Sequence, residues 1–224
     1  MLDKRLVIIT GHYGSGKTEF AINYAIKIKE NFENVSLADL DIVNPYFRSR
    51  EKKSLLESKG IHVIESSIHS TTIELPALSS GIMGIIQNQN MHSILDVGGD
   101  PVGAKVLSRF SDLIKENEYD LFYVINGNRP ETRKKEDVIN YLKAIENSSS
   151  LRATGLINNT HLLKSTTIVD VEYGHELAKK VSWELDIPIR YEVAMESITD
   201  KISNKEIEDK FFPINLYMRE EWMS

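Results

Sequence analysis

The feature that most constrains this chain is the segment Gly-His-Tyr-Gly-Ser-Gly-Lys-Thr at residues 11–18, which directly follows the apolar run at residues 6–9. It matches the phosphate-binding pattern G-x-x-x-x-G-K-[ST], in which a strand leads through a glycine-rich turn into a helix. The glycines let successive backbone N–H groups face one concavity, and the helix N-terminus adds partial positive charge. The segment therefore predicts a site for a nucleoside triphosphate; the alternative is a glycine-rich turn without a ligand.

The residues of this segment have separate expected roles. Lys17 supplies a mobile cation for the outer phosphates and is a candidate catalytic residue, and the Thr18 hydroxyl is a candidate ligand for Mg²⁺. The residues expected around the nucleotide phosphates are Gly11, Gly14, Ser15, Gly16, Lys17 and Thr18.

Strand-like apolar runs alternate with helical patterns along the whole chain. Strands are expected at 6–10, 35–40, 61–65, 93–97, 121–126, 154–158 and 188–193, and helices near 16–30, 46–58, 75–88, 101–117, 131–147 and 168–185. This alternation indicates βαβ units, and strands that are apolar at consecutive positions are typical of a sheet covered on both faces. We therefore expect a three-layer αβα fold with a mainly parallel central sheet of about seven strands, in a single domain over residues 1–224.

Composition narrows the classes of protein. The 33 acidic and 27 basic residues give a net charge of −6 without a basic stripe, so nucleic acid is not the expected partner. The absence of cysteine excludes disulfides, thiolate metal sites and cysteine nucleophiles. Neither a signal-peptide pattern nor a membrane-length apolar run occurs, so we expect a cytoplasmic protein without stable membrane insertion.

Polar residues are expected at the carboxyl ends of the strands, where parallel sheets bind ligands. Asp96 ends one apolar strand, and a carboxylate at this position is the usual outer partner of Mg²⁺. Gly99 follows in a D-x-x-G pattern, and its N–H can approach a γ-phosphate because no side chain intervenes. The alternative is a plain turn that caps the helix after Pro101.

Asp39 and Asp41 close another expected strand. Because residues i and i+2 of a strand point to the same side, both carboxylates can face the metal and phosphates. One would support the water shell of the metal, and the other would orient an attacking water or substrate hydroxyl. An Asp-rich surface turn is the alternative.

These motifs resemble the MinD/ParA/CobQ-CobB group of P-loop proteins, in the SIMIBI class. The resemblance covers about residues 5–195 and includes the phosphate loop, the D-x-D followed by Asn-Pro, the Asp-Val-Gly-Gly-Asp segment and an Asn at a later strand end. It implies that Asp41 positions the attacking water, that Asp39 and Asp96 lie around the metal, and that Asn158 binds the base. Asn159 is the alternative base contact, because strand boundaries are uncertain by a few residues.

The resemblance also bears on the base and on dimerisation. Members of the group are mostly ATP-dependent, and the guanine-reading N-K-x-D is replaced here by Asn-Asn-Thr-His at 158–161, which favours ATP. The dimeric members carry K-G-G-x-G-K-[ST], whose first lysine reaches the nucleotide of the partner. His12 and Tyr13 stand at its first two positions, so a homodimer would need another cation. Arg48, Arg50 and Arg129 are candidates; solvated helix-face charges are the alternative.

Three functions are consistent with these residues. The first is an ATP- and Mg²⁺-dependent switch whose hydrolysis is read by an unidentified protein partner. The second is a ligase or transferase, similar to dethiobiotin synthetase or cobyrinate amidase, with a small-molecule second substrate. The third is a nucleotide-binding module with negligible hydrolysis. The apolar tail at residues 211–223 is expected to pack on the body of the protein rather than on a membrane.

Overall fold

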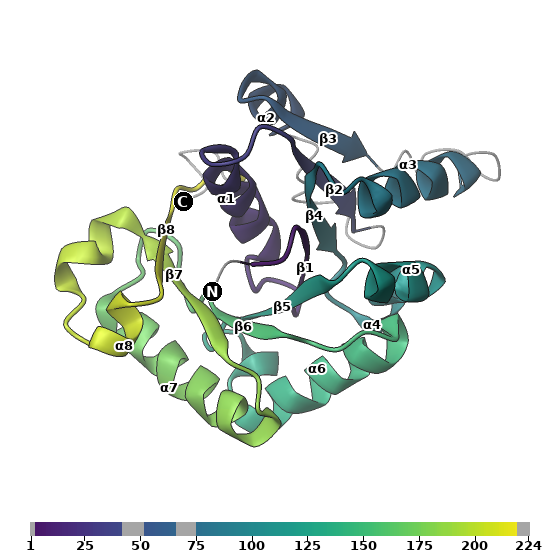
Figure 1. Ribbon diagram of the computed structural model, residues 1–224. Coiled ribbons are helices and arrows are strands. Elements are labelled where there is room, and N and C mark those ends of the chain that lie inside the picture. Colours follow the sequence, from purple (N-terminus) through teal and green to yellow (C-terminus); the bar gives the residue numbers. More distant parts are fainter. Residues whose placement is uncertain (1–2, 42–51, 66–74, 219–224) are drawn as a thin grey trace.

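The computed structural model describes residues 3–41, 52–65 and 75–218. Their centre is an eight-stranded sheet with the order β3-β2-β4-β1-β5-β6-β7-β8 (Figure 1), in which every neighbouring pair is parallel. The strands are β1 (Leu6–Thr10), β2 (Val35–Leu40), β3 (Ile61–Glu65), β4 (His92–Val97), β5 (Tyr119–Ile125), β6 (Gly155–Asn158), β7 (Ile189–Met195) and β8 (Phe211–Ile214). The expected α/β fold with a parallel sheet is confirmed, and β8 is an additional strand.

The helices follow the expected alternation, with α8 as an additional helix and with differences in two of the expected ranges. They are α1 (Lys17–Lys29), α2 (Lys53–Ser58), α3 (Leu75–Gln87), α4 (Pro101–Ala104), α5 (Ser111–Glu116), α6 (Lys135–Ser149), α7 (Ile168–Leu185) and α8 (Lys205–Glu208). The helix expected at 101–117 is divided into α4, a 3₁₀ segment at Lys105–Phe110 and α5, and the helix expected near 46–58 is described only from residue 52.

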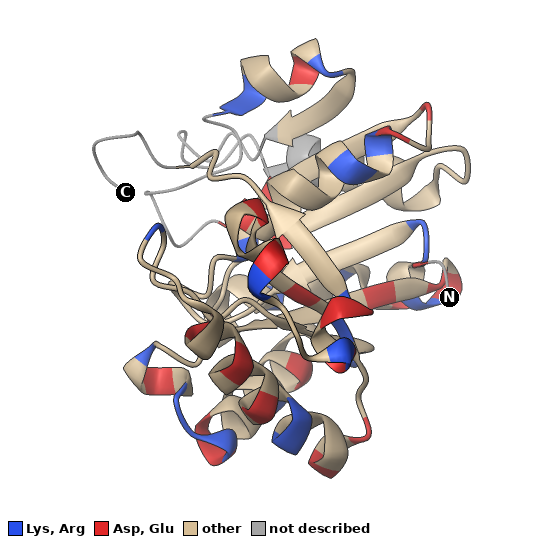
Figure 2. Cartoon of the chain, turned by 90° about the vertical axis from the view of Figure 1, so that its left-hand side faces the viewer, with Lys and Arg blue, Asp and Glu red and all other residues tan. Residues whose placement is uncertain are grey.

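Helix α1 lies on the concave side of the curved sheet, whereas α3, α5, α6 and α7 cover the other side (Figure 1). Residues 17–25 of α1 are all buried, the polar ones included, and Phe20, Ala21, Ile22 and Ala25 are 0% exposed. Nine consecutive buried residues cover more than the whole circumference of a helix, so this part of α1 needs cover beyond a single sheet face. Most Lys, Arg, Asp and Glu residues belong instead to helices and turns around the sheet (Figure 2).

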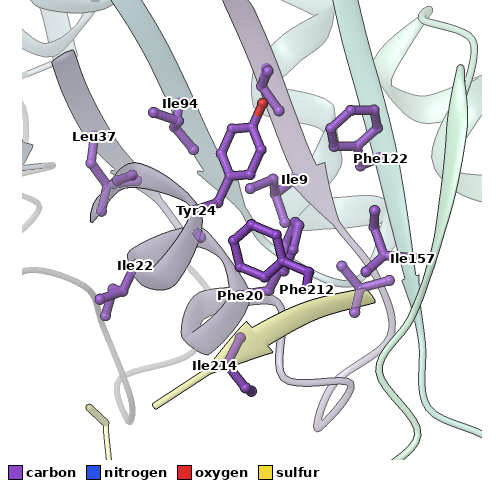
Figure 3. Packing of buried hydrophobic residues seen from close by; sticks show 14 of the residues in the cluster. Ile9, Phe20, Ile22, Tyr24, Leu37, Ile94, Phe122, Ile157, Phe212 and Ile214 are labelled. Atoms are coloured by element: carbon purple, nitrogen blue, oxygen red, sulfur yellow. The ribbon is translucent and has the colours of Figure 1, made fainter. Parts of the chain in front are cut away.

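Strand β8 supplies part of that cover. It pairs with β7, and its Phe212 and Ile214 join the cluster around α1 (Figure 3). Pro213 lacks an N–H donor and is therefore suited to a strand at the sheet edge. The same proline makes the short apolar run resemble a tail, which explains why the strand is missed in the sequence.

The segment after β8 is fastened to α1 by hydrogen bonds. The Asn215 N–H donates to Asn23 Oδ1 at 2.9 Å, and Asn23 Nδ2 donates to the Asn215 carbonyl at 2.9 Å. The Tyr217 and Met218 N–H groups donate to the Glu19 carboxylate. Residues 211–218 therefore pack on the body, as expected; the rest of the predicted tail lies outside the described residues.

Among the described residues, no helix is both long enough and apolar enough to cross a membrane.

We expect Phe20→Ala to lower the free energy of unfolding by about 3–5 kcal/mol, because it removes a fully buried ring and leaves a cavity. The Phe20 ring centroid lies 5.3 Å from that of Phe212 and 5.6 Å from that of Tyr24. Urea unfolding followed by circular dichroism measures the change. As a control, Trp183→Ala should change stability by less than about 0.5 kcal/mol, because Trp183 is 88% exposed. Equal losses in the two variants would contradict the assignment of the core around α1.

Candidate functional site

The phosphate-loop segment connects β1 to α1 in the conformation that its glycines require. Gly14 and Gly16 have φ angles of 76° and 82°, in the left-handed region that favours glycine. Gly16 is also the N-cap of α1, and a Cβ atom there would lie 2.3 Å from Asn159 Nδ2. The loop therefore has both the backbone conformation and the tight packing of a phosphate cradle.

Lys17, at the start of α1, lies among three carboxylates. Its Nζ donates to Asp41 Oδ2 at 2.8 Å, and both side chains are buried. Burial alone would lower the pKa of Lys17, but Asp96, Asp41 and Asp39 together raise it above its ordinary value. The ammonium is thus firmly charged in the absence of a ligand.

Sheet register explains how these carboxylates meet. Asp39 on β2 is the partner of Asp96 on β4, and Asp96 is in turn the partner of Ile9 on β1. The Asp41 N–H then donates to Asp39 Oδ1 at 3.1 Å, just beyond the end of β2. Strands far apart in sequence therefore deliver their carboxylates to one point next to the phosphate loop.

Asp96 is poised for a cation. Burial raises its pKa to about 7, although the Lys17 ammonium and the Thr18 hydroxyl act in the opposite direction. Apart from the Thr18 hydroxyl, the described residues offer no hydrogen-bond donor to the Asp96 oxygens. Buried carboxylate oxygens with so few donors fit a hard cation such as Mg²⁺.

A metal ion at this site would need phosphate oxygens and water as ligands in addition to protein side chains. Within the described ranges, no group of three or more His, Cys, Asp or Glu side chains is arranged to hold a metal ion. Mg²⁺ commonly binds through one or two protein oxygens, substrate phosphates and water. The expected metal ligands Thr18, Asp39 and Asp96 suit that mode, and their role stays a prediction.

Gly99 touches the phosphate loop through its backbone. A Cβ atom at Gly99 would lie 2.1 Å from the Gly11 carbonyl oxygen, so only glycine fits. The helix-capping alternative for this segment is also present in the structure, because Asp100 Oδ1 accepts hydrogen bonds from the Val102 and Gly103 N–H groups at 2.8 Å. The segment therefore both caps α4 and packs on the loop.

The two candidate base contacts lie in different surroundings. Asn159 Nδ2 donates to the Ser15 carbonyl at 2.8 Å, and its Oδ1 is buried without a hydrogen-bond partner in the described part of the chain. Asn158 instead donates to the Val171 carbonyl and to Glu192 Oε2, at 3.0 and 2.7 Å. Asn159 therefore borders the phosphate loop, whereas Asn158 faces α7 and β7; a contact of either with a base stays a prediction.

Two further polar residues hold the phosphate loop. Asn126 Nδ2 and Arg129 Nε both donate to the Gly14 carbonyl, at 3.3 and 2.9 Å. Asn126 directly follows β5, a position where the sequence already indicates a polar residue, but its contact with Gly14 has no sequence signal. Of the arginines proposed as replacement cations, Arg129 lies at the loop, and Arg48 and Arg50 lie outside the described residues.

His12 and Tyr13, which occupy the positions of the missing lysine motif, differ in exposure. The His12 ring packs edge-on against Tyr141 of α6, with centroids 4.5 Å apart, whereas Tyr13 is 58% exposed. The His12 side chain is thus engaged within its own chain, and Tyr13 is accessible beside the loop.

A cavity of about 220 Å³ opens beside the phosphate loop. Its lining includes loop residues together with Lys17, Arg129 and Asn159, and it also includes several apolar residues. Most of the apolar residues come from β7, β8 and the segment that follows, and they include Met195, Ile214, Leu216 and Met218. A cavity lined both by hydrogen-bond donors for phosphate and by apolar side chains suits a nucleotide.

Comparisons with solved structures find this fold in FtsY proteins. FtsY of Thermotoga maritima, a cell division protein, is 20% identical with a TM-score of 0.54, over 85% of this chain and 62% of that chain. FtsY of Mycoplasma mycoides is 15% identical with a TM-score of 0.55, over 85% and 60%. The signal recognition particle receptor FtsY of Elizabethkingia anophelis in complex with GDP is 15% identical with a TM-score of 0.53, over 85% and 57%.

At these identities the likeness shows the fold alone, and this chain spans about three fifths of the length of the FtsY chains. The described chain therefore has the three-layer αβα fold of P-loop proteins such as FtsY. No protein-family model matches the sequence, and no curated protein matches it. Membership of the MinD/ParA/CobQ-CobB group stays a prediction.

We expect the ligand-free protein to lose stability as pH rises from about 4 to about 7, because folding raises the pKa of Asp96 from 3.8 to about 7. The folded state binds the extra proton in this window, and that stabilisation is gone above the folded pKa. Asp96→Asn should remove the loss and make the protein more stable than wild type at about pH 8. Urea unfolding at several pH values measures this effect.

The matched control is Asp112→Asn, because the Asp112 side chain is 95% exposed. This substitution should leave the pH profile unchanged. An Asp96→Asn protein that is no more stable than wild type at about pH 8 would contradict the raised pKa.

Proposed function

We propose that this protein binds ATP with Mg²⁺ at the phosphate loop and hydrolyses it slowly, as a nucleotide-dependent switch for a protein partner. The observation that carries the proposal is the buried Lys17 ammonium among Asp39, Asp41 and Asp96, next to the glycine-rich loop. Because three buried carboxylates face one ammonium, the arrangement suits a metal cation, which would offset the excess negative charge and allow the phosphates to bind with it.

Nucleotide binding would rearrange the Lys17–Asp41 ion pair. Lys17 would turn from Asp41 to the outer phosphates, where an ammonium stabilises developing negative charge. Asp41 would then be able to orient an attacking water. Thr18, Asp39 and Asp96 would hold Mg²⁺ directly or through water, and the metal would supply neutralisation of phosphate charge.

The polar groups of the cavity support adenine as the proposed base. With one N–H of Asn159 bound to Ser15, its Oδ1 and remaining N–H match the adenine N6 donor and N7 acceptor. A guanine reader of the N-K-x-D type places Asp three residues after its Asn, but that position here is His161 when counted from Asn158 and Leu162 when counted from Asn159. GDP in the FtsY structure of Elizabethkingia anophelis favours GTP as the second candidate.

The segment after β4 would transmit nucleotide state. Gly99 contacts Gly11 and Gly98 approaches Asp41, so a change in the Lys17–Asp41 pair would reach α4 through backbone contacts. Val102 on α4 is 68% exposed and Tyr13 is 58% exposed, which gives a protein partner or a second copy of the chain two accessible side chains to contact. An enzyme with a small-molecule second substrate is the alternative use of the same site.

Lys17→Ala should weaken MgATP binding by at least about 100-fold, because it removes charge-assisted hydrogen bonds to the phosphates. Isothermal titration calorimetry with MgATP and MgGTP measures both the affinity and the base preference, and we expect ATP to bind at least about 10-fold more tightly. Lys115→Ala is the control, because the Lys115 side chain is 50% exposed. Unchanged ATP affinity in Lys17→Ala would refute the site, whereas preference for GTP would refute only the base assignment.

Asp41→Asn should separate binding from hydrolysis. MgATP affinity should stay the same or increase, because Lys17 no longer has to leave an ion pair, while ADP production should fall by about 100-fold. Calorimetry and a steady-state ADP assay measure the two quantities, with Asp112→Asn as the control. Wild-type turnover in Asp41→Asn would rule out the proposed role in orienting water.

A further inference from the structure

A second group of buried polar side chains lies between β6, β7 and α7, next to Asn159. His175 of α7 is 1% exposed, and Glu192 of β7 and Asn158 of β6 are both 0% exposed. Glu192 Oε1 lies 2.6 Å from His175 Nδ1, and Glu192 Oε2 accepts a hydrogen bond from Asn158 Nδ2 at 2.7 Å. We call these three side chains the His175–Glu192–Asn158 network.

Burying a carboxylate and an imidazole costs free energy, so the position of this network in the fold needs an explanation. Burial raises the pKa of Glu192, against the effect of its bonds to His175 and Asn158. Buried polar networks are retained when every member is satisfied, and they then fix one arrangement of the surrounding chain. Sheet register places Asn158 and Glu192 directly opposite each other on β6 and β7.

Asn158 connects this network to the nucleotide side. Its Oδ1 accepts a hydrogen bond from the Thr160 N–H at 3.1 Å, and its Nδ2 also donates to the Val171 carbonyl on α7. Thr160 Oγ1 in turn accepts from the Gly127 N–H at 2.9 Å. The residues on both sides of Asn159 are therefore held, and Asn159 is left pointing at the phosphate loop.

Helix α7 packs closely against the turn at residues 158–160. A Cβ atom at Gly174 would lie 2.1 Å from Thr160 Oγ1 and 2.2 Å from Asn158 Oδ1. Glycine is unfavourable inside a helix, so its presence here matches the need for close contact. A displacement of His175 or Glu192 would therefore move the turn at 158–160.

We infer that His175 and Glu192 are positioning residues, which act through Asn158 to hold Asn159 where it contacts the nucleobase. The inference rests on the proposed nucleotide site. The network also has an outer end: Glu206 Oε2 of α8 lies 3.2 Å from His175 Nε2 and 3.1 Å from Lys179 Nζ. His175 thus faces Glu192, which is bonded to Asn158, and Glu206, which is paired with Lys179.

The test compares two ligands that differ only in the nucleoside. Inorganic tripolyphosphate with Mg²⁺ engages the phosphate loop alone, whereas MgATP also engages the base contact. Glu192→Leu removes the acceptor for Asn158 and should weaken MgATP binding by about 10-fold, with a change of less than about 2-fold for tripolyphosphate. A residue that served stability alone would not separate the two ligands.

Glu192→Gln is the conservative rescue. Its amide oxygen can accept from Asn158 while its N–H faces His175, so both affinities should return to within about 2-fold of wild type. Glu206→Gln, at the exposed outer end, should likewise leave both affinities within about 2-fold. The inference is overturned if Glu192→Leu weakens both ligands equally or neither, or if Glu192→Gln binds ATP as weakly as Glu192→Leu.

A second measurement uses the wild-type protein, so it remains valid even if a variant fails to fold. MgATP should slow hydrogen exchange at the Thr160 N–H more than Mg²⁺-tripolyphosphate does, and equal effects would overturn the inference. Failure of the proposed function has a different result, since wild type would then bind neither ligand. Binding of both ligands without the expected difference refutes the positioning role alone.

Discussion

One ammonium group, that of Lys17, compensates three buried carboxylates at the carboxyl ends of the central strands. The register of β2 and β4 brings Asp39 and Asp96 together, and the loop after β1 brings Lys17 to them. Without a ligand, burial raises the pKa of Asp96 to about 7, and the neighbouring Asp39 and Asp41 carboxylates act in the same direction. The surrounding chain fixes these residues tightly, through Gly16 against Asn159 and Gly99 against Gly11.

Two separate groups of buried polar side chains lie on either side of Asn159. On one side, Asp39, Asp41 and Asp96 lie near the phosphate loop; on the other, His175, Glu192 and Asn158 lie between β6, β7 and α7. Asn159 is the residue between them, with its amide on the Ser15 carbonyl. Adjacent asparagines at a strand end thus have different roles, because successive residues of an extended chain point in opposite directions.

The sequence predicts the parts of this fold that depend on local pattern. Helix α7 begins and ends where expected, since Thr167 and Asp170 form a capping box and Asp186 ends it with a φ of 55°. The phosphate loop and the carboxylates of β2 and β4 also follow from motif and strand end. Strand β8 does not, because Pro213 conceals a short edge strand whose pairing with β7 is a tertiary property.

Contacts that form only in the folded chain cannot be predicted from the sequence. The bond from Arg129 to the Gly14 carbonyl joins residues 115 positions apart, and no spacing rule indicates it. The choice between Asn158 and Asn159 depends on a one-residue register, which is smaller than the uncertainty of a predicted strand end. The buried pair of His175 and Glu192 likewise has no local pattern, because α7 and β7 meet only after the sheet has formed.

The attachment of the segment after β8 to α1 has a consequence for the order of folding. The hydrogen bond from the Met218 N–H to Glu19 joins positions 199 residues apart, so one of the earliest helices in the chain is covered by one of its latest described segments. Long-range contacts of this kind form late, because the intervening chain must first be ordered. During synthesis, α1 therefore keeps an apolar side exposed, and the wall of the cavity made by Leu216 and Met218 is completed only when folding is nearly finished.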